Sequence, residues 1–234
     1  MKDLKIFIKG ETIDLCKPTI KFAKESSWYS WFNKDYIVRY LSHHYKEKNN
    51  TPKKQVEFLR STKKNRFILI LRTKDKLYKG VVSLSFIDNK TKTCDIAVVT
   101  DVNIDPKNSP YAPLEAVARL TQYAFDNMKM KKISGAAVFA LRKWQQRMEL
   151  FGYKIETLKF DRYAINSELY NLHYVSCTYE DYLKIKKNRS GFFWDDLKKM
   201  KMRIAKLPKI TFRDRLVDFM KKRRDKYYNK LFSI

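Results

Sequence analysis

The segment from Cys94 to Met128 has residue types and a spacing that suit the binding of an anionic oxygen. An apolar, β-branched strand is predicted over 96–104, turn residues follow at 105–110, and a helix is predicted around Pro113 and Glu115. Proline suits the first turn of a helix, and a glutamate there lies near the positive end of the helix dipole. Because the first backbone N–H groups of a helix lack intrahelical partners, such a junction can bind a phosphate. An ordinary strand–helix unit of a mixed domain explains the same residues equally well.

Cysteine and histidine give little support for metal or disulfide chemistry. Cys16, Cys94 and Cys177 are far apart, odd in number and form no CxxC pair. His43 and His44 are adjacent, but the sequence contains no HxH or HExxH pattern, so we expect no metal site. It also contains no GxSxG, Walker or GxGxxG motif, which argues against the esterase, NTPase and dinucleotide-binding classes.

The composition is that of a folded and strongly basic chain. Its 234 residues are 44% hydrophobic and 15% aromatic, enough for one sizeable domain with an appendage. The net charge of +26 predicts attraction to a polyanion, which could be nucleic acid, an anionic membrane face or a phosphorylated substrate. With no apolar run of signal-peptide or membrane-spanning type, we expect a protein of the reducing cytoplasm, either soluble or peripheral at the inner face of the membrane.

Hydrophobic periodicity predicts strands and helices in mixed order. The last two predicted strands are expected to pair antiparallel, and Gly152 is expected to end the helix before them as its C′ residue. The predicted strands cover residues 5–8, 12–15, 66–71, 77–86, 94–104, 131–139, 153–158 and 169–177. The predicted helices cover segments of 21–41, residues 53–61, the stretch from Pro113 to Met128, and residues 142–151.

Several of these segments carry phrases that resemble the GNAT superfamily of acyl-CoA-dependent N-acyltransferases. The order and spacing of the phrases over residues 5–182 resemble most closely the branch that contains ribosomal-protein alanine acetyltransferases and bacterial amino-sugar acetyltransferases. The resemblance implies an α+β fold, with a mixed, mostly antiparallel central sheet flanked by helices. The phrases are Trp31-Phe32-Asn33, Lys79-Gly80-Val81, Cys94-Asp95-Ile96-Ala97, Glu115-Ala116 and Glu149-Leu150-Phe151-Gly152-Tyr153.

The resemblance also implies acetyl-CoA as co-substrate and a pyrophosphate-binding loop at residues 107–112. In the family this loop wraps the pyrophosphate with backbone amides at the start of the following helix. Lys107 can add positive charge next to a phosphate. The implied cofactor-binding residues are Ile104, Lys107, Asn108, Ser109, Tyr111 and Ala112.

Three residues are candidates for the chemistry that the resemblance implies. Asp95 takes the place of a glutamate common on the family's central strand, and it is the candidate base or acceptor contact. Tyr170 is the candidate proton donor to the leaving thiolate. His43 follows a helix that borders the acceptor pocket in the family, so it is a candidate to bind or deprotonate the amine. Each has a plainer interpretation: Asp95 as a strand-edge cap or lysine partner, Tyr170 as a core tyrosine, and His43 as part of a polar loop.

Residues 183–234 lie outside the resemblance and form a basic tail. From Lys184 onward there are 18 basic and 5 acidic residues, a balance of +13. Amphipathic helices with aromatic residues are predicted on both sides of Pro208. Such helices are typical of peripheral membrane anchors, they also fit nucleic acid, and they could instead pack on the domain or in a dimer.

We therefore expect a GNAT-like domain over residues 1–182 and a basic helical tail over 183–234. The predicted function is transfer of an acetyl group from acetyl-CoA to a small-molecule amine, with a nucleotide-linked amino sugar for surface-glycan biosynthesis as the favoured acceptor. The alternatives are acetylation of a protein N-terminus or of nucleic acid, and a GNAT-like module without catalysis that binds nucleic acid or a membrane.

Overall fold

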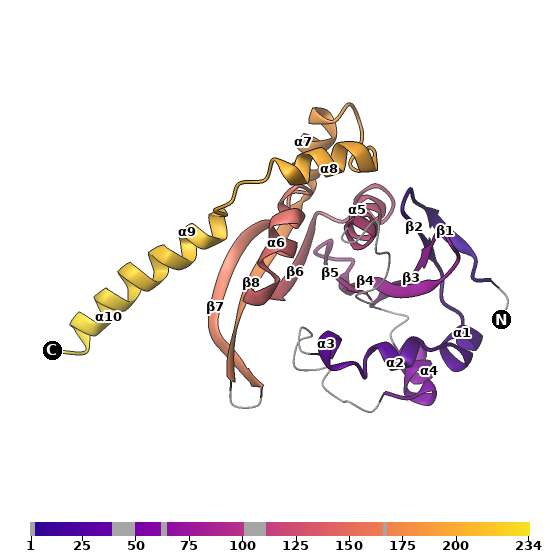
Figure 1. The fold of residues 1–234 in the computed structure, drawn as a ribbon, viewed down its shortest axis with the longest axis horizontal. Coiled ribbons are helices and arrows are strands. Elements are labelled where there is room, and N and C mark those ends of the chain that lie inside the picture. Colours follow the sequence, from indigo (N-terminus) through magenta and orange to yellow (C-terminus); the bar gives the residue numbers. More distant parts are fainter. Residues whose placement is uncertain (1–2, 39–49, 62–64, 101–110, 166–167) are drawn as a thin grey trace.

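The computed structural model describes residues 3–38, 50–61, 65–100, 111–165 and 168–234 (Figure 1). Within these ranges one eight-stranded sheet has the order β1-β2-β3-β4-β5-β6-β8-β7. Neighbouring strands are antiparallel except β5 and β6, which are parallel. The strands are β1 (Ile6–Lys9), β2 (Ile13–Cys16), β3 (Phe67–Thr73), β4 (Tyr78–Asp88), β5 (Thr93–Thr100), β6 (Lys132–Val138), β7 (Lys154–Ile165) and β8 (Glu168–Thr178). The predicted α+β fold with a mostly antiparallel sheet is confirmed.

Helices cover both faces of this sheet, with α5 on one face and α1 to α4 on the other (Figure 1). The N-terminal helices are α1 (Ile20–Glu25), α2 (Trp28–Trp31), α3 (Asp35–Val38) and α4 (Pro52–Ser61). The later ones are α5 (Tyr111–Asp126), the 3-10 turn η3 (Phe139–Leu141), α6 (Arg142–Glu149), α7 (Tyr179–Asn188), α8 (Leu197–Ala205), α9 (Phe212–Phe219), the π-helical turn η4 (Met220–Arg224) and α10 (Asp225–Leu231).

The strict alternation of side chains along the central strands produces two hydrophobic cores, one on each face. On β3, Leu69 and Leu71 pack in the core that contains α5, whereas Ile68 and Ile70 pack in the core that contains Trp28 of α2. Both sets of residues are buried. The sheet is therefore covered on both sides near its middle, as its continuous apolar strands require.

The helix ends match the sequence in one place and differ in another. Gly152 has a φ of +76°, the left-handed conformation expected of a C′ glycine, and a Cβ there would lie 3.1 Å from the Cys177 Sγ. The predicted extension of α5 to Met128 is wrong, because the helix ends at Asp126 and Lys129 then adopts a left-handed φ of 59°. Met128 nevertheless packs against the core from the connection.

Glu115 fastens α5 to the turn between β1 and β2. Its fully buried carboxylate accepts hydrogen bonds from the backbone N–H groups of Glu11 and Thr12, each at 2.7 Å, and from the Thr12 hydroxyl at 2.6 Å. The Arg119 guanidinium donates another at 3.1 Å. Gly10 fits beside this carboxylate because a Cβ there would lie 2.8 Å from its Oε1. Glu115 thus has a specific tertiary role, in addition to its place in the first turns of the helix.

The first half of the basic C-terminal segment packs on the domain. Phe193, Trp194 and Met200 are buried in the same core as α5, and the Trp194 indole donates a hydrogen bond to Glu11 at 3.1 Å. The second half, from Phe212, extends away from the sheet (Figure 1). Among the described residues, no helix combines the length and the apolar character needed to cross a bilayer. The division at residue 182 stays a prediction.

Candidate active site

The parallel strands β5 and β6 separate part of the way along their length. They pair only at Thr93 with Lys132, Cys94 with Ile133 and Asp95 with Ser134, although β5 continues to Thr100 and β6 to Val138. Their other edges stay paired with β4 and β8 over the same stretch. Beyond Asp95 and Ser134, the two facing edges have no strand partner in the described part of the chain. Backbone N–H and C=O groups on these edges are therefore available to an extended ligand that carries amide groups.

Small residues border this opening. Gly135, Ala136 and Ala137 follow Ser134 on β6, and Ala97 lies two residues beyond Asp95 on β5. Ala97 and Ala136 are exposed although both belong to central strands of the sheet. A glycine within a strand often marks a place where a ligand approaches the backbone closely. The opening therefore combines unpaired backbone edges with little side-chain bulk.

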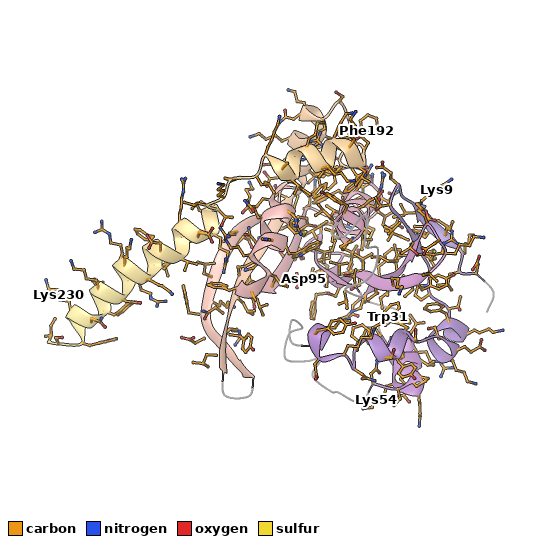
Figure 2. All side chains as sticks on the ribbon, viewed as in Figure 1. Lys9, Trp31, Lys54, Asp95, Phe192 and Lys230 are labelled. Carbon is orange, nitrogen blue, oxygen red and sulfur yellow. The ribbon has the colours of Figure 1, made fainter. Side chains whose placement is uncertain are left out.

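Asp95 lies at the last paired position before the strands separate, where the two halves of the sheet meet in Figure 2. Its neighbours Cys94 and Ile96 pack in the core with α5, so the Asp95 side chain projects from the opposite face, which carries α1 to α4. No other described side chain forms a hydrogen bond or ion pair with its carboxylate. Burial raises its pKa, because burial disfavours the charged form. Asp95 is thus a partly buried carboxylate with increased basicity, suited to accept a proton.

Hydroxyl groups extend from Asp95 across the neighbouring strands. Asp95 pairs with Ser85 of β4 and Ser134 of β6, and Ser134 pairs in turn with Ser176 of β8. Directly opposed residues of neighbouring strands project on the same face with Cβ atoms about 4.5–5.5 Å apart. Ser85 and Ser176 are buried. This polar row can orient a polar acceptor next to the carboxylate. β5 is an interior strand of the sheet, and Asp95 lies where its edge toward β6 becomes unpaired.

The N-terminus of α5 carries two of the predicted cofactor-binding residues, Tyr111 and Ala112. Ala112 is fully buried in the core that contains α5. The Lys201 ammonium of α8 lies 5.5 Å from the centre of the Tyr111 ring. Burial lowers the pKa of the Arg147 guanidinium on α6, and an electrostatic interaction with Tyr111 partly opposes this shift. In the described part of the chain, no carboxylate lies within ion-pair distance of Arg147. A partly buried cation beside a helix N-terminus suits a phosphate.

No sequence pattern indicated Arg147 or Lys201 as candidates. They are two of 51 basic residues, and they are distant in sequence from Tyr111. The apolar spacing of Trp144, Met148 and Phe151 predicted which side of α6 is buried, but not what lies next to its partly buried arginine. Lys201 belongs to the segment predicted to be a tail, and only the packing of α8 places it here.

The structure does not bring all the predicted catalytic residues together. Tyr170 pairs with Tyr163 near the far end of β8. It lies six residues from Ser176, about 20 Å along an extended strand. His43 lies outside the described residues, as do Ile104, Lys107, Asn108 and Ser109, so their predicted roles stay predictions.

The remaining histidine, His173, is a core residue. It is 1% exposed beside the Phe139 ring, and burial together with the nearby Arg213 lowers its pKa to about 4. It is therefore neutral at physiological pH. Within the described ranges, no group of three or more His, Cys, Asp or Glu side chains could hold a metal ion.

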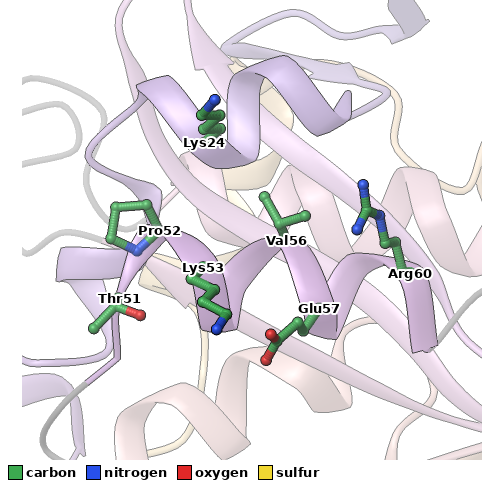
Figure 3. A pocket seen from close by; sticks show the side chains of 7 residues that line it. All are labelled: Lys24, Thr51, Pro52, Lys53, Val56, Glu57 and Arg60. Carbon is green, nitrogen blue, oxygen red and sulfur yellow. The ribbon is translucent and has the colours of Figure 1, made fainter.

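Two surface hollows lie away from Asp95. One, of about 520 Å³, lies between α1 and α4, and its lining combines the cations Lys24, Lys53 and Arg60 with Glu57 and uncharged side chains (Figure 3). The other, of about 460 Å³, lies between Glu11 and the start of α8. Neither contains a residue of the polar row or of the strand opening, but Lys201, which lies beside Tyr111, lines the second hollow.

The arrangement of this sheet and its helices is similar to the fold of solved acetyltransferases. Spermidine N-acetyltransferase from Vibrio cholerae, solved with CoA and spermine, matches with a TM-score of 0.63 at 14% identity, covering 74% of this chain and 98% of that chain. The microcin C7 self-immunity acetyltransferase MccE, solved with acetyl-CoA and AMP, matches with a TM-score of 0.59 at 22% identity, covering 72% and 93%. No family model and no curated protein sequence matches. The predicted GNAT-like fold is confirmed, and the narrower branch stays a prediction.

Proposed function

We propose that this protein transfers an acetyl group from acetyl-CoA to the primary amine of an acceptor, and that the transfer takes place next to Asp95. The observation that carries the proposal is the separation of β5 and β6 directly beyond this residue. It provides an opening through the sheet in which a ligand chain from the α5 side can meet an acceptor from the side of α1 to α4. Two neighbours of the same fold were solved with CoA or acetyl-CoA, which supports the choice of co-substrate.

Acetyl-CoA supplies a thioester whose carbonyl carbon accepts the amine nitrogen as the carbon–sulfur bond breaks. Asp95 accepts the proton that the amine must lose, directly or through one water molecule. Backbone N–H groups on the open edges of β5 and β6 donate hydrogen bonds to the developing oxyanion and to the amide groups of the ligand. The first N–H groups of α5, with Arg147 and Lys201, hold the pyrophosphate. Tyr170 stays a prediction for the proton donor to sulfur.

For the acceptor, we propose an amine that also carries an anionic group, such as a nucleotide-linked amino sugar. A chain of net charge +26 concentrates anions around it and repels polycations. MccE was solved with AMP, so a neighbour of this fold binds a nucleotide. The spermine bound by the spermidine acetyltransferase is a cation, opposite in charge to AMP. We therefore expect turnover of nucleotide-linked amines to exceed that of spermidine.

The test compares the wild-type chain, Asp95→Asn and the charge-matched control Glu25→Gln. Acetyl-CoA at a hundredfold excess over Kd should stabilise all three by about 2.7 kcal/mol. Acetylation of the nucleotide-linked amino sugar should fall by about 10²–10⁴-fold only in Asp95→Asn. Undiminished turnover in Asp95→Asn would show that Asp95 does not accept the amine proton. Absence of stabilisation in the wild type would favour the non-catalytic module, and a steep loss of acceptor binding with salt would favour a nucleic acid acceptor.

A further inference from the structure

The C-terminal helix is fixed to the domain along one side. It runs from Phe212 to Leu231 through α9, η4 and α10, and Figure 1 shows it extending away from the sheet. Asp214 accepts hydrogen bonds from the Arg142 guanidinium, at 2.8 and 2.9 Å for its Nε, and closes a capping box with Thr211. Further along, the Arg224 guanidinium lies 4.7 Å from the centre of the Phe160 ring. These contacts set the orientation of the helix relative to the domain.

An apolar stripe remains uncovered on this helix. It consists of Phe212, Phe219, Tyr227 and Leu231, which are 62%, 58%, 63% and 45% exposed. Phe212 and Phe219 are seven residues apart, which is about two α-helical turns. Phe219 and Tyr227 are eight residues apart, and the π-helical turn η4 between them inserts one extra residue. The π turn therefore keeps Tyr227 and Leu231 in line with Phe212 and Phe219.

Positive charge accompanies the stripe. Residues 212–231 contain eight basic and three acidic side chains, and Lys221, Arg223 and Lys226 are exposed. A second copy of a chain of net charge +26 would be repelled, so charge complementarity selects an anionic partner. A nucleic acid would match the cations, but it would leave a row of aliphatic and aromatic side chains without an apolar environment. An anionic lipid surface matches both, because apolar residues enter the headgroup boundary while cations contact the headgroups.

We propose that α9, η4 and α10 form an interfacial helix that holds the protein on an anionic lipid bilayer. The helix is about 30 Å long, and it lies in the plane of the surface with the apolar stripe facing the lipid. Because the helix is fixed to the domain through Asp214 and Arg224, the domain binds in one orientation. This role is independent of acetyl transfer.

Co-sedimentation of the full-length chain with vesicles tests the proposal. The vesicles are phosphatidylcholine alone and phosphatidylcholine with about 30% phosphatidylglycerol, and a DNA duplex serves as the nucleic acid probe. Phe219→Ser with Tyr227→Ser removes apolar area without changing charge, and Phe86→Ser is the matched control because this β4 aromatic is 70% exposed. A second variant replaces Lys221, Arg223 and Lys226 by Gln. Circular dichroism and the melting temperature confirm that each variant is folded.

The wild type should bind the anionic vesicles and not the neutral ones. The Phe219→Ser, Tyr227→Ser variant should lose at least about tenfold in affinity, and the charge variant about a hundredfold, since each cation near the surface contributes roughly fivefold. Phe86→Ser should bind as the wild type does. Equal binding to both vesicle types, unchanged binding by the apolar variant, or binding to DNA but not to anionic vesicles would each overturn the proposal.

Discussion

Two carboxylates of this protein, Glu115 and Asp95, lie in surroundings that differ in almost every respect. Glu115 is fully buried and accepts hydrogen bonds from two backbone N–H groups, a hydroxyl and a guanidinium. Asp95 is half-buried between two serines, and no described residue forms a hydrogen bond or ion pair with its carboxylate. Folding therefore satisfies the first carboxylate completely and leaves the second available.

Burial alone does not identify which of these two carboxylates is available for chemistry. The more buried acid is the structural one, because its lone pairs are already used to join α5 to the β1–β2 turn. The less buried acid has a raised pKa and adjoins an opening in the sheet. A carboxylate that can still accept a proton is the one that can do chemistry.

The largest expected effect is on stability at Glu115. Glu115→Ala leaves two buried backbone N–H groups and the Thr12 hydroxyl without their acceptor, so the free energy of unfolding should fall by about 3–5 kcal/mol. Urea denaturation measures this change. Asp95→Ala in the same assay should change it by no more than about 1 kcal/mol. Equal losses in the two variants would remove the distinction between the sites.

A smaller effect is expected on acetyl-CoA affinity at Arg147. Arg147→Gln removes a partly buried cation beside the N-terminus of α5, and Kd should rise by about ten- to a hundredfold. Lys143→Gln, an exposed position on the same helix, should leave Kd unchanged. Isothermal titration calorimetry gives both values. If the two variants bind equally well, the phosphates are held elsewhere.

Added bulk at Ala97 should affect turnover and leave the fold intact. The Ala97 side chain is exposed on the same face as Asp95, so Ala97→Leu should obstruct the acceptor and lower kcat/KM by about tenfold. The melting temperature should not change, because no core side chain has to move. Leucine at Ala116, which is fully buried, should instead destabilise the protein by about 1–3 kcal/mol. A wild-type kcat/KM in Ala97→Leu would place the acceptor on another surface.

The smallest expected effect is the pH dependence of stability at Asp95. Folding raises its pKa above the ordinary value of 3.8, so the folded state binds the proton more tightly and burial of the charged form costs stability above the folded pKa. Asp95→Asn should therefore be more stable than the wild type at pH 7, and the difference should vanish below pH 3.8. Urea midpoints measured from pH 3 to pH 7 give this curve. If Asp95→Asn is instead less stable than the wild type at pH 7, and this deficit disappears as the pH falls, folding lowers the pKa of Asp95.

Local patterns predicted much of this fold. Alternating and continuous apolar runs placed the strands and gave the antiparallel β7–β8 pair, although β7 extends seven residues beyond its predicted end at Leu158. The left-handed conformation of Gly152 followed from a single residue type. Asp95 was found through the resemblance of one strand to a known family. Each of these inferences depends on neighbours in the chain.

The rest depends on contacts between distant residues. The separation of β5 from β6 depends on how the two strands and their helices pack. No residue type in either strand predicts it. Arg147 and Lys201 meet Tyr111 only because α6 and α8 pack near the start of α5. The role of Glu115 required Glu11 and Thr12, more than 100 residues away.

Hydrogen–deuterium exchange with and without acetyl-CoA tests the central claim most directly, because it needs no knowledge of the acceptor. If the ligand lies between the separated strands, backbone amides at 96–100 of β5, at 135–138 of β6 and at the start of α5 should become protected. Strands β1 and β2 should exchange as before. Binding of acetyl-CoA without protection on β5 and β6 would contradict the account, as would the absence of binding.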